Sequence, residues 1–271
     1  MSIRNRLFEA SFLLAGTLLA PAAATAQDSG AWRTSATIYA YLPSLSGKTS
    51  FPTGSGTPID VSTEQILDSL KMTFMGSLDA HNGRWGLFTD VIYLDLGNTK
   101  TSSRDFTIGG IGIPADTTAD LGLDLKGWVW TLAGEFRVAS DAGWTVDAIG
   151  GARMLDLKER LDWNIAGSLG PLPPTSRSGA SEVSQTVWDG IVGLKGRYAF
   201  GDRREWSLPF YLDVGAGQSQ RTWQAAAGVG YAFKWGELSA LYRYLDYDMK
   251  SGKAIQSVRF SGPMVGATFR W

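Results

Sequence analysis

The sequence predicts an all-β protein, a single closed antiparallel transmembrane barrel of about ten strands, with eight or twelve as alternatives. Three features of the chain after Trp32 carry this prediction. Hydrophobic side chains alternate with a period of two, connections alternate between short and long, and tryptophans gather near the ends of the expected strands. An even strand count places both chain ends on one side of the membrane, which for this architecture is the periplasmic side.

The alternation is clearest over residues 221–234, where Trp223 and Val229 share one face and Gln224 and Lys234 share the other. A strand puts successive side chains on opposite faces, so this pattern predicts a strand with one apolar surface. The same period predicts ten strands, at residues 32–43, 71–81, 84–98, 120–138, 144–162, 184–200, 205–217, 221–234, 237–248 and 255–271.

The connections alternate in length along the chain. Tight turns are expected at 82–83, 139–143, 201–204 and 235–236, long loops at 44–70, 99–119 and 163–183, and shorter connections near 218–220 and 249–254. A soluble β-sandwich has no reason to place its long loops at alternate connections, whereas a membrane barrel has short turns on one side and long loops on the other. We therefore expect the three long loops to be external and the turns at 139–143 and 201–204 to be periplasmic.

Tryptophans mark both ends of the expected strands. Residues 32, 85, 144, 206, 235 and 271 lie beside short turns or chain ends, and residues 128, 163, 188 and 223 lie toward the long loops. Trp188 and Tyr198 share the outward face of one strand, and at ~3.3 Å per residue and ~45° tilt they are about 23 Å apart along the membrane normal. That separation is close to the ~25 Å band between the aromatic girdles of membrane barrels.

The first residues have the pattern of a secretory signal peptide. Arg4 and Arg6 precede an apolar stretch at 12–20, and an A-x-A site at 24–26 predicts cleavage after Ala26. An N-terminal membrane anchor is the alternative, but the apolar stretch is too short to span a bilayer as a helix. The expected organisation is a signal peptide at 1–26 and an outer-membrane barrel at 27–271.

Composition narrows the function classes. The chain has no cysteine, which excludes disulfides, thiol catalysis and cysteine-ligated metals. Its 25 basic and 26 acidic residues give no electrostatic reason to bind nucleic acid. His81 is the single histidine, too few soft ligands for zinc, so we predict no metal and no cofactor.

The C-terminus resembles a known assembly signal. Gly266, Phe269 and Trp271 match the glycine, aromatic and terminal aromatic positions of the C-terminal signal of Gram-negative outer-membrane barrels, whose pattern also has a polar residue where this chain has Met264. More broadly, residues 189–195, 222–224 and 242–246 resemble small outer-membrane β-barrels, OmpA-like or porin-type, of unassigned function. The resemblance implies delivery by periplasmic chaperones and insertion by the barrel assembly machinery. Outer-membrane lipids and lipopolysaccharide are the other expected partners, because basic residues at the rim can pair with lipopolysaccharide phosphates. The resemblance supplies no activity.

The faces opposite the apolar ones carry a balanced set of charges. The expected ion-pair network of the lumen comprises Asp79, Asp90, Glu135, Arg137, Asp147, Arg153, Asp189, Lys195, Arg197, Asp213 and Arg243, with Arg270 on the same side. Because an eight-stranded barrel is just filled by side chains, a ten-stranded one is narrow, and paired charges would largely fill it.

Strand ends predict which of these charges meet. Arg243 is expected opposite Gly228, and Lys195 diagonal to Asp213. Of Asp147–Arg197 and Arg153–Asp189, one pair is expected directly opposite and the other diagonal. We also expect a short helix from a capping box at 62–65 through Leu70, with Ile66, Leu67 and Leu70 on one side.

Three functions are compatible with this sequence. The first is a non-enzymatic barrel that is structural or displays loops, with a charged and largely plugged lumen. The second is a narrow pore for ions or small solutes, and the third is an outer-leaflet enzyme that cleaves lipids or peptides. His81 shares a face with Asp79 but lies at the periplasmic end, which disfavours the enzyme. In a plugged lumen, changing Arg153 or Arg243 to Ala is expected to raise conductance.

Overall fold

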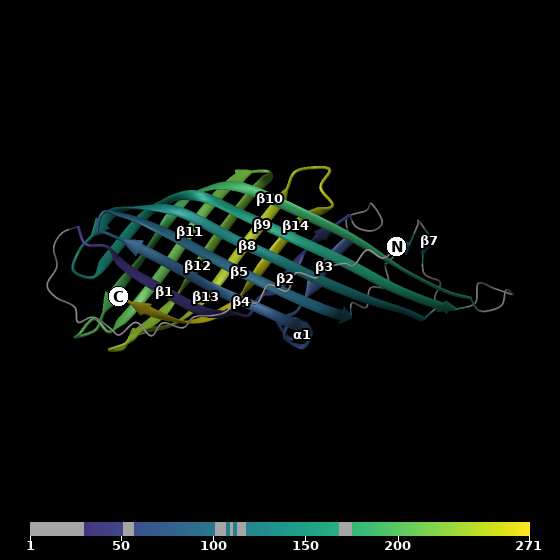
Figure 1. Ribbon diagram of the computed structural model, residues 1–271, viewed down its shortest axis with the longest axis horizontal. Helices are drawn as coiled ribbons and strands as arrows, with labels where there is room; N and C mark the ends of the chain where they lie inside the picture. The colour runs from purple at the N-terminus through teal and green to yellow at the C-terminus, as the bar shows by residue number, and fades with distance from the viewer. Residues whose placement is uncertain (1–29, 51–56, 101–106, 109–110, 113–117, 168–174) are drawn as a thin grey trace, which may run out of the picture.

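The computed structural model describes residues 30–50, 57–100, 107–108, 111–112, 118–167 and 175–271. The predicted signal peptide lies outside these residues. The fold is a closed antiparallel barrel of ten strands, shown in Figure 1 with its long axis horizontal. The barrel strands are β1 (Arg33–Tyr41), β4 (Leu70–His81), β5 (Trp85–Lys100), β8 (Thr118–Ser140), β9 (Trp144–Gly167), β10 (Thr175–Phe200), β11 (Trp206–Gly217), β12 (Ser219–Ala232), β13 (Gly236–Met249) and β14 (Ile255–Arg270).

Each barrel strand pairs with the next one in this order, and β14 closes the barrel by pairing with β1. The predicted strand count and antiparallel closure are therefore confirmed. The tight turns join β4 to β5, β8 to β9, β10 to β11 and β12 to β13 at the end of the barrel where β14 finishes. We call this end the short-turn end and the opposite one the long-loop end. No helix in the described residues is long and apolar enough to cross a membrane.

Two strands extend farther than their alternation predicts. β9 reaches Gly167 and β10 begins at Thr175, so much of the loop expected at 163–183 is paired strand. In Figure 1 these strands project well beyond the rest of the barrel. The backbone pairing of β9 with β10 continues through this part, where exposed side chains form charge pairs such as Lys158 with Glu182 at 2.8 Å. A period-two hydrophobic search does not detect strands of this kind.

The expected loop at 44–70 also contains regular structure. It holds β2 (Ser44–Thr49), β3 (Thr57–Val61) and α1 (Thr63–Ser69). β2 pairs with the start of β14, and β3 pairs with β2, so both strands extend the wall outside the ten-strand circuit. Between β5 and β8, the described residues include two paired strands of two residues each, β6 (Thr107–Ile108) and β7 (Ile111–Gly112).

The predicted capping box is present at the start of α1. The Gln65 backbone N–H donates to Ser62 Oγ at 3.2 Å, and the Ser62 backbone N–H donates to Gln65 Oε1 at 2.9 Å. Ile66 is buried against the barrel core, but Leu67 is 49% exposed. The expectation that these two residues share an apolar side is wrong, because neighbouring helical residues point about 100° apart.

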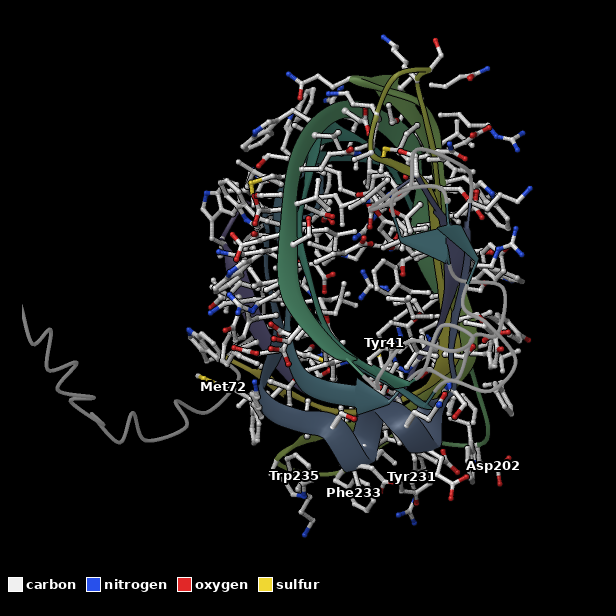
Figure 2. All side chains as sticks on the ribbon, turned by 90° about the vertical axis from the view of Figure 1, so that its right-hand side faces the viewer. Tyr41, Met72, Asp202, Tyr231, Phe233 and Trp235 are labelled. Carbon is white, nitrogen blue, oxygen red and sulfur yellow. The ribbon has the colours of Figure 1, made fainter. Side chains whose placement is uncertain are left out.

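The outer surface has an apolar band between two aromatic girdles. Figure 2 shows Tyr231, Phe233 and Trp235 projecting outward from the wall. They lie at the end of β12 and in the turn that follows it, at the short-turn end, where Trp206 also packs on Tyr231 with ring centroids 4.8 Å apart. Toward the long-loop end, Trp223 stacks on Tyr244 at 4.5 Å. The side chain of Trp163, predicted for the second girdle, lies outside the description. An apolar band between two aromatic girdles is the outer surface of a barrel that contacts lipid.

Candidate functional site in the barrel interior

The inward-facing side chains change from charged to apolar along the strands. On β9, Asp147 and Arg153 are followed toward the long-loop end by Leu155 and Leu157, all of them buried. The charged layer, nearer the short turns, consists of Asp79, Asp90, Glu135, Arg137, Asp147, Arg153, Asp189, Lys195, Arg197, Asp213, Glu237, Arg243 and Arg270. The apolar layer above it consists of Tyr41, Leu45, Val61, Ile66, Met75, Ile92, Leu94, Leu96, Leu125, Val129, Leu155, Leu157, Val187, Leu245, Tyr247, Met249, Ile255, Val258 and Phe260.

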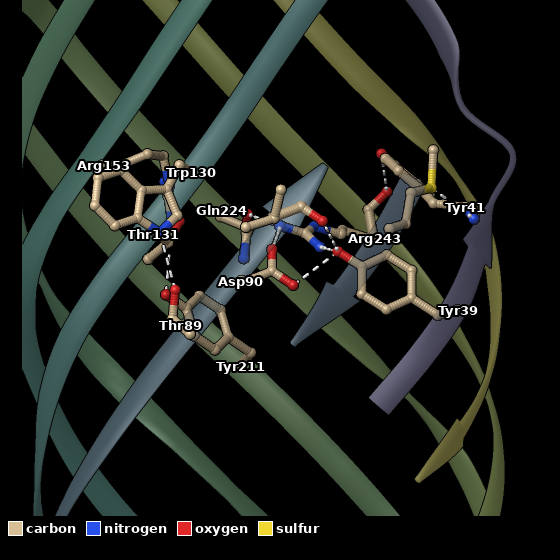
Figure 3. Close-up of polar contacts among 12 residues, drawn as sticks. Tyr39, Tyr41, Thr89, Asp90, Trp130, Thr131, Arg153, Tyr211, Gln224 and Arg243 are labelled. Carbon is tan, nitrogen blue, oxygen red and sulfur yellow. Dashed lines mark hydrogen bonds and ion pairs between the residues drawn. The ribbon is translucent and has the colours of Figure 1, made fainter. Parts of the chain in front are cut away.

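Arg243 ties opposite walls of the barrel together. Its guanidinium donates to Asp90 Oδ2 at 2.7 Å and to Gln224 Oε1 at 2.8 Å. The hydroxyl of Tyr39 accepts from Arg243 at 3.1 Å and donates to Asp90 at 2.7 Å, closing the cluster that Figure 3 shows. Since β14, β1 and β4 separate β13 from β5 along the wall, the Arg243–Asp90 pair crosses the lumen.

Arg153 forms a second buried cluster. Its guanidinium forms a bidentate pair with Asp213, one arm at 2.9 Å, and its Nε donates to Thr131 Oγ1 at 3.1 Å. The side chains of Arg153 and Asp213 are both 0% exposed. A two-point guanidinium–carboxylate pair of this kind is the geometry that fixes both orientation and charge most firmly.

The register between β9 and β10 places Arg153 directly opposite Asp189, as the sequence allowed, yet the two side chains do not pair. Arg153 reaches past Asp189 to the next strand, where it meets Asp213. Asp189 instead accepts the Ser219 backbone N–H at 2.9 Å, and its other oxygen has no hydrogen-bond partner among the described residues.

Lys195 lies at the centre of the charges nearest the short turns. Its ammonium contacts Asp79 and donates to Glu135 at 2.6 Å. The pairing of Lys195 with Asp213 expected from the sequence is wrong. The β10–β11 register has the predicted alignment, with Lys195 opposite Tyr211, but the side chain crosses the lumen to β4 instead of following the wall.

Two further pairings differ from expectation. Asp147 binds Arg137 on β8 through two hydrogen bonds of 2.5 and 3.1 Å, and not Arg197. Arg197 and Arg270 both reach Glu237, at 3.0 and 2.6 Å. Glu237 was missing from the predicted network, although it begins a strand on the same inward face as Arg243.

The predicted partner of Arg243 on β12 is wrong by two residues. Arg243 lies opposite Ala226, and Gly228 lies opposite Leu241. The hairpin closes with the Phe233 backbone N–H donating to the Gly236 carbonyl, so the two turn residues are 234 and 235 and not the expected 235 and 236. The shift is an even number of residues, so Arg243 keeps its inward orientation.

His81 lies beside carboxylates at the short-turn end. Its Nδ1 accepts the Gly83 backbone N–H at 2.7 Å, and its Nε2 is 3.4 Å from Asp147 Oδ1. His81, Glu135 and Asp147 offer ligand atoms within 4.8 Å of one another, a spacing compatible with a metal. Both carboxylates already hold a cation, Lys195 or Arg137. The absence of a metal stays a prediction.

The residues of the predicted assembly signal lie at the end of β14 and directly after it. Phe269 faces outward, 42% exposed, and packs on Trp235 with centroids 5.4 Å apart. Trp271 exchanges two backbone hydrogen bonds of 3.0 Å with Thr34. Gly266 allows close approach of β1, since a Cβ there would lie 3.0 Å from the Tyr39 Cβ.

The apolar layer is the part of the interior that sequence reasoning missed. Its signal was a local loss of alternation, as in the unbroken apolar run 91–94. Such a run occurs where both faces of a strand are apolar, here toward lipid and toward an apolar interior.

Comparison with known proteins supports the fold. Neither a protein-family model nor a curated protein matches this chain. Among solved structures, the outer-membrane protease OmpT of Escherichia coli aligns with a TM-score of 0.52 at 9% identity, over 91% of this chain and 98% of that one. The attachment invasion locus protein Ail of Yersinia pestis aligns at 0.33 and 14% identity, over 90% and 100%. The translocator domain of the autotransporter NalP of Neisseria meningitidis aligns at 0.40 and 17%, over 89% of both chains. At these identities the likeness concerns architecture, and the chain has the fold of the small outer-membrane β-barrels of Gram-negative bacteria.

Proposed function

We propose that this protein is a sealed, non-enzymatic barrel that serves as a structural element of the outer membrane and displays its long loops at the cell surface. The observation that carries the proposal is the burial of the two charged clusters around Arg153 and Arg243 in the barrel interior. Arg153 is 0% exposed and Arg243 3% exposed, and their carboxylate partners Asp213 and Asp90 are 1% and 5% exposed. Charged groups from which water is excluded favour a lumen that water does not cross at this level.

The location and partners of the barrel follow from the same proposal. The short-turn end faces the periplasm and the long-loop end faces outward, after cleavage of the signal peptide behind Ala26. Periplasmic chaperones and the barrel assembly machinery deliver the chain through its C-terminal signal. Outer-membrane lipids and lipopolysaccharide surround the finished barrel.

Planar-bilayer recording of the refolded protein tests the sealed lumen. The charged and apolar layers lie in series, so removing one should leave the other as a barrier. We expect no steady single-channel conductance from the wild type, from Arg243→Ala, or from a variant with Leu245→Ala and Phe260→Ala in the apolar layer. A variant that combines Arg153→Ala and Arg243→Ala with Leu245→Ala and Phe260→Ala should conduct. This replaces the simpler expectation that a single arginine change opens the lumen.

Arg259→Ala is the matched control, since this exposed arginine pairs with Asp246 at the rim and not in the lumen. Heat-modifiable migration on gels would confirm that each variant is folded. Steady conductance from the wild type would contradict the proposal and identify a narrow pore instead.

The non-enzymatic part rests on His81, the single histidine, which lies at the short-turn end with one nitrogen engaged by a backbone N–H. Purified barrel in vesicles should cleave neither phospholipid, lipopolysaccharide nor peptide, and His81→Asn should behave like the wild type. Turnover that His81→Asn abolishes would show that the protein is an enzyme.

A further inference from the structure

We propose that the barrel wall has a lateral slit between β1 and β4 through which one alkyl chain of a membrane lipid enters the apolar layer. The slit is the region where residues 39–41 of β1 face residues 70–75 of β4. In the described chain, the pairing of these two strands ends at Ile38 and Gly76. Beyond that point β1 continues along β14, and β4 continues along β5, so the two strands separate.

A side chain, and not a backbone ladder, closes the slit. The Tyr41 backbone N–H donates to Met75 Sδ at 3.2 Å. A thioether is a weak acceptor on a flexible, unbranched side chain, whereas backbone groups in a membrane wall normally pair with backbone groups. The wall is therefore held at this place by its most easily displaced kind of contact.

An apolar cavity of about 20 Å³ lies directly behind the slit. Tyr41, Pro43 and Met75 line it on the slit side, and Leu94, Leu125 and Leu157 lie beyond them. A space of this size holds about one water-sized group, and its apolar lining favours a hydrocarbon over water. Rotation of the Met75 side chain joins the cavity to the slit and makes room for the end of a chain.

The depth of the slit in the membrane identifies the occupant. From His81 at the short-turn end to Gly76, β4 rises about 12 Å at ~3.3 Å per residue and ~45° tilt, which is half of the ~25 Å apolar band. The slit therefore opens into the leaflet on the long-loop side. Beside it, the outward side chains of Ile38, Met72 and Phe74 are apolar and more than half exposed, so lipid alkyl chains are its neighbours there. The exposed Lys71, which pairs with Asp124 at 3.5 Å, lies at the end of the slit nearer the long loops. Figure 2 shows Met72 outside the wall and Tyr41 inside it.

The cavity has a polar floor and an apolar cover. The cluster of Arg243, Asp90 and Tyr39 lies one step below Tyr41 along β1 and prevents a chain from passing toward the short turns. α1 follows β3 and leads into β4 with Ile66 buried in the apolar layer. The slit therefore leads to a blind pocket for one chain end, and the sealed lumen needs no opening.

Photo-crosslinking in vesicles tests this proposal. The full barrel is refolded into vesicles containing a phospholipid with a diazirine near the end of one acyl chain, and labelled residues are mapped by mass spectrometry. We expect labelling of the interior residues Leu94, Leu125 and Leu157 in addition to the outward residue Phe74. Labelling confined to outward residues would overturn the proposal.

Variants with opposite expected effects strengthen the test. Met75→Ala widens the slit and should raise interior labelling, relative to Phe74, several-fold. Gly127→Ala adds a methyl group to the cavity lining and should lower interior labelling several-fold. Its closest contact is the flexible end of the Leu157 side chain at 2.7 Å, and the Asp156 carbonyl oxygen lies at 3.4 Å. Met72→Ala is the matched control on the outer face of the same strand and should change nothing. If Met75→Ala fails to fold, the Gly127→Ala variant tests the proposal by itself. Interior labelling that is unchanged in Gly127→Ala would show that the alkyl chain does not occupy this cavity.

A second probe separates the source of the chain. A diazirine-bearing free alkane, added to vesicles of unlabelled lipid, should compete with the lipid probe for the same interior residues. Interior labelling by the free alkane alone, with none from the lipid probe, would overturn the assignment to a membrane lipid.

Discussion

Arg153 shows that the charged partner of a residue in the lumen is not always the charged residue opposite it on the neighbouring strand. It faces Asp189 in the register, but pairs with Asp213 and Thr131 while fully buried. A long side chain in a narrow barrel can reach carboxylates on several strands. Arg153 therefore pairs with the carboxylate that accepts two hydrogen bonds and not with the nearest one. Burial without that partner would leave an uncompensated charge.

Removing Arg153 is therefore expected to be costly. Arg153→Ala should lower the free energy of unfolding by about 3–5 kcal/mol, because it leaves Asp213 buried and unpaired. The exposed pair of Lys158 with Glu182 should contribute only about 0–1 kcal/mol, which makes Lys158→Ala the comparison. Denaturant titration of both variants in vesicles measures the difference, and equal losses would show that the lumen at Arg153 is wet.

The pair can also be removed as a unit. Arg153→Met with Asp213→Leu should recover most of the stability lost in Arg153→Ala, since an apolar pair of similar volume leaves no buried charge. A double variant as unstable as the single one would indicate that Thr131 and Tyr211, not the ion pair, set the local stability.

At the scale of elements, β14 does more than close the barrel. Its last residues carry the aromatic girdle, and Trp271 adds a rung of two backbone hydrogen bonds to β1 beyond the end of the strand. Closure depends on this junction, because it joins the first and last strands of the chain.

Deletion of Trp271 should leave much less folded barrel in the outer membrane, measured by heat-modifiable migration. Trp271→Ala keeps the backbone rung with Thr34 and should be less severe than the deletion. Trp235→Ala removes a neighbouring girdle aromatic outside the C-terminal signal and serves as the control. Unchanged yield after the deletion would show that the resemblance of the C-terminus to an assembly signal is superficial.

For the whole molecule, the length asymmetry of the connections sets the expected orientation. Cysteine introduced at Lys250, between β13 and β14, should react with an impermeant reagent added to intact cells, and cysteine at Asp141 or Asp202 should not. The chain has no native cysteine, so the labelling needs no background substitution. Reaction at Asp141 with protection at Lys250 would reverse the orientation.

The sequence by itself determined the closed barrel, its ten strands and the inward orientation of its charges. These properties follow from the two-residue hydrophobic period, which is a local feature of the sequence. The two-residue error in the predicted strand pairing at Arg243 leaves every side chain on the same face. Only the tertiary structure decided which charges meet, that an apolar layer lies above them, and that β1 and β4 separate at Gly76. Contacts across a lumen join strands that are far apart in order along the wall, as Lys195 and Asp79 do, and no spacing within one strand encodes them.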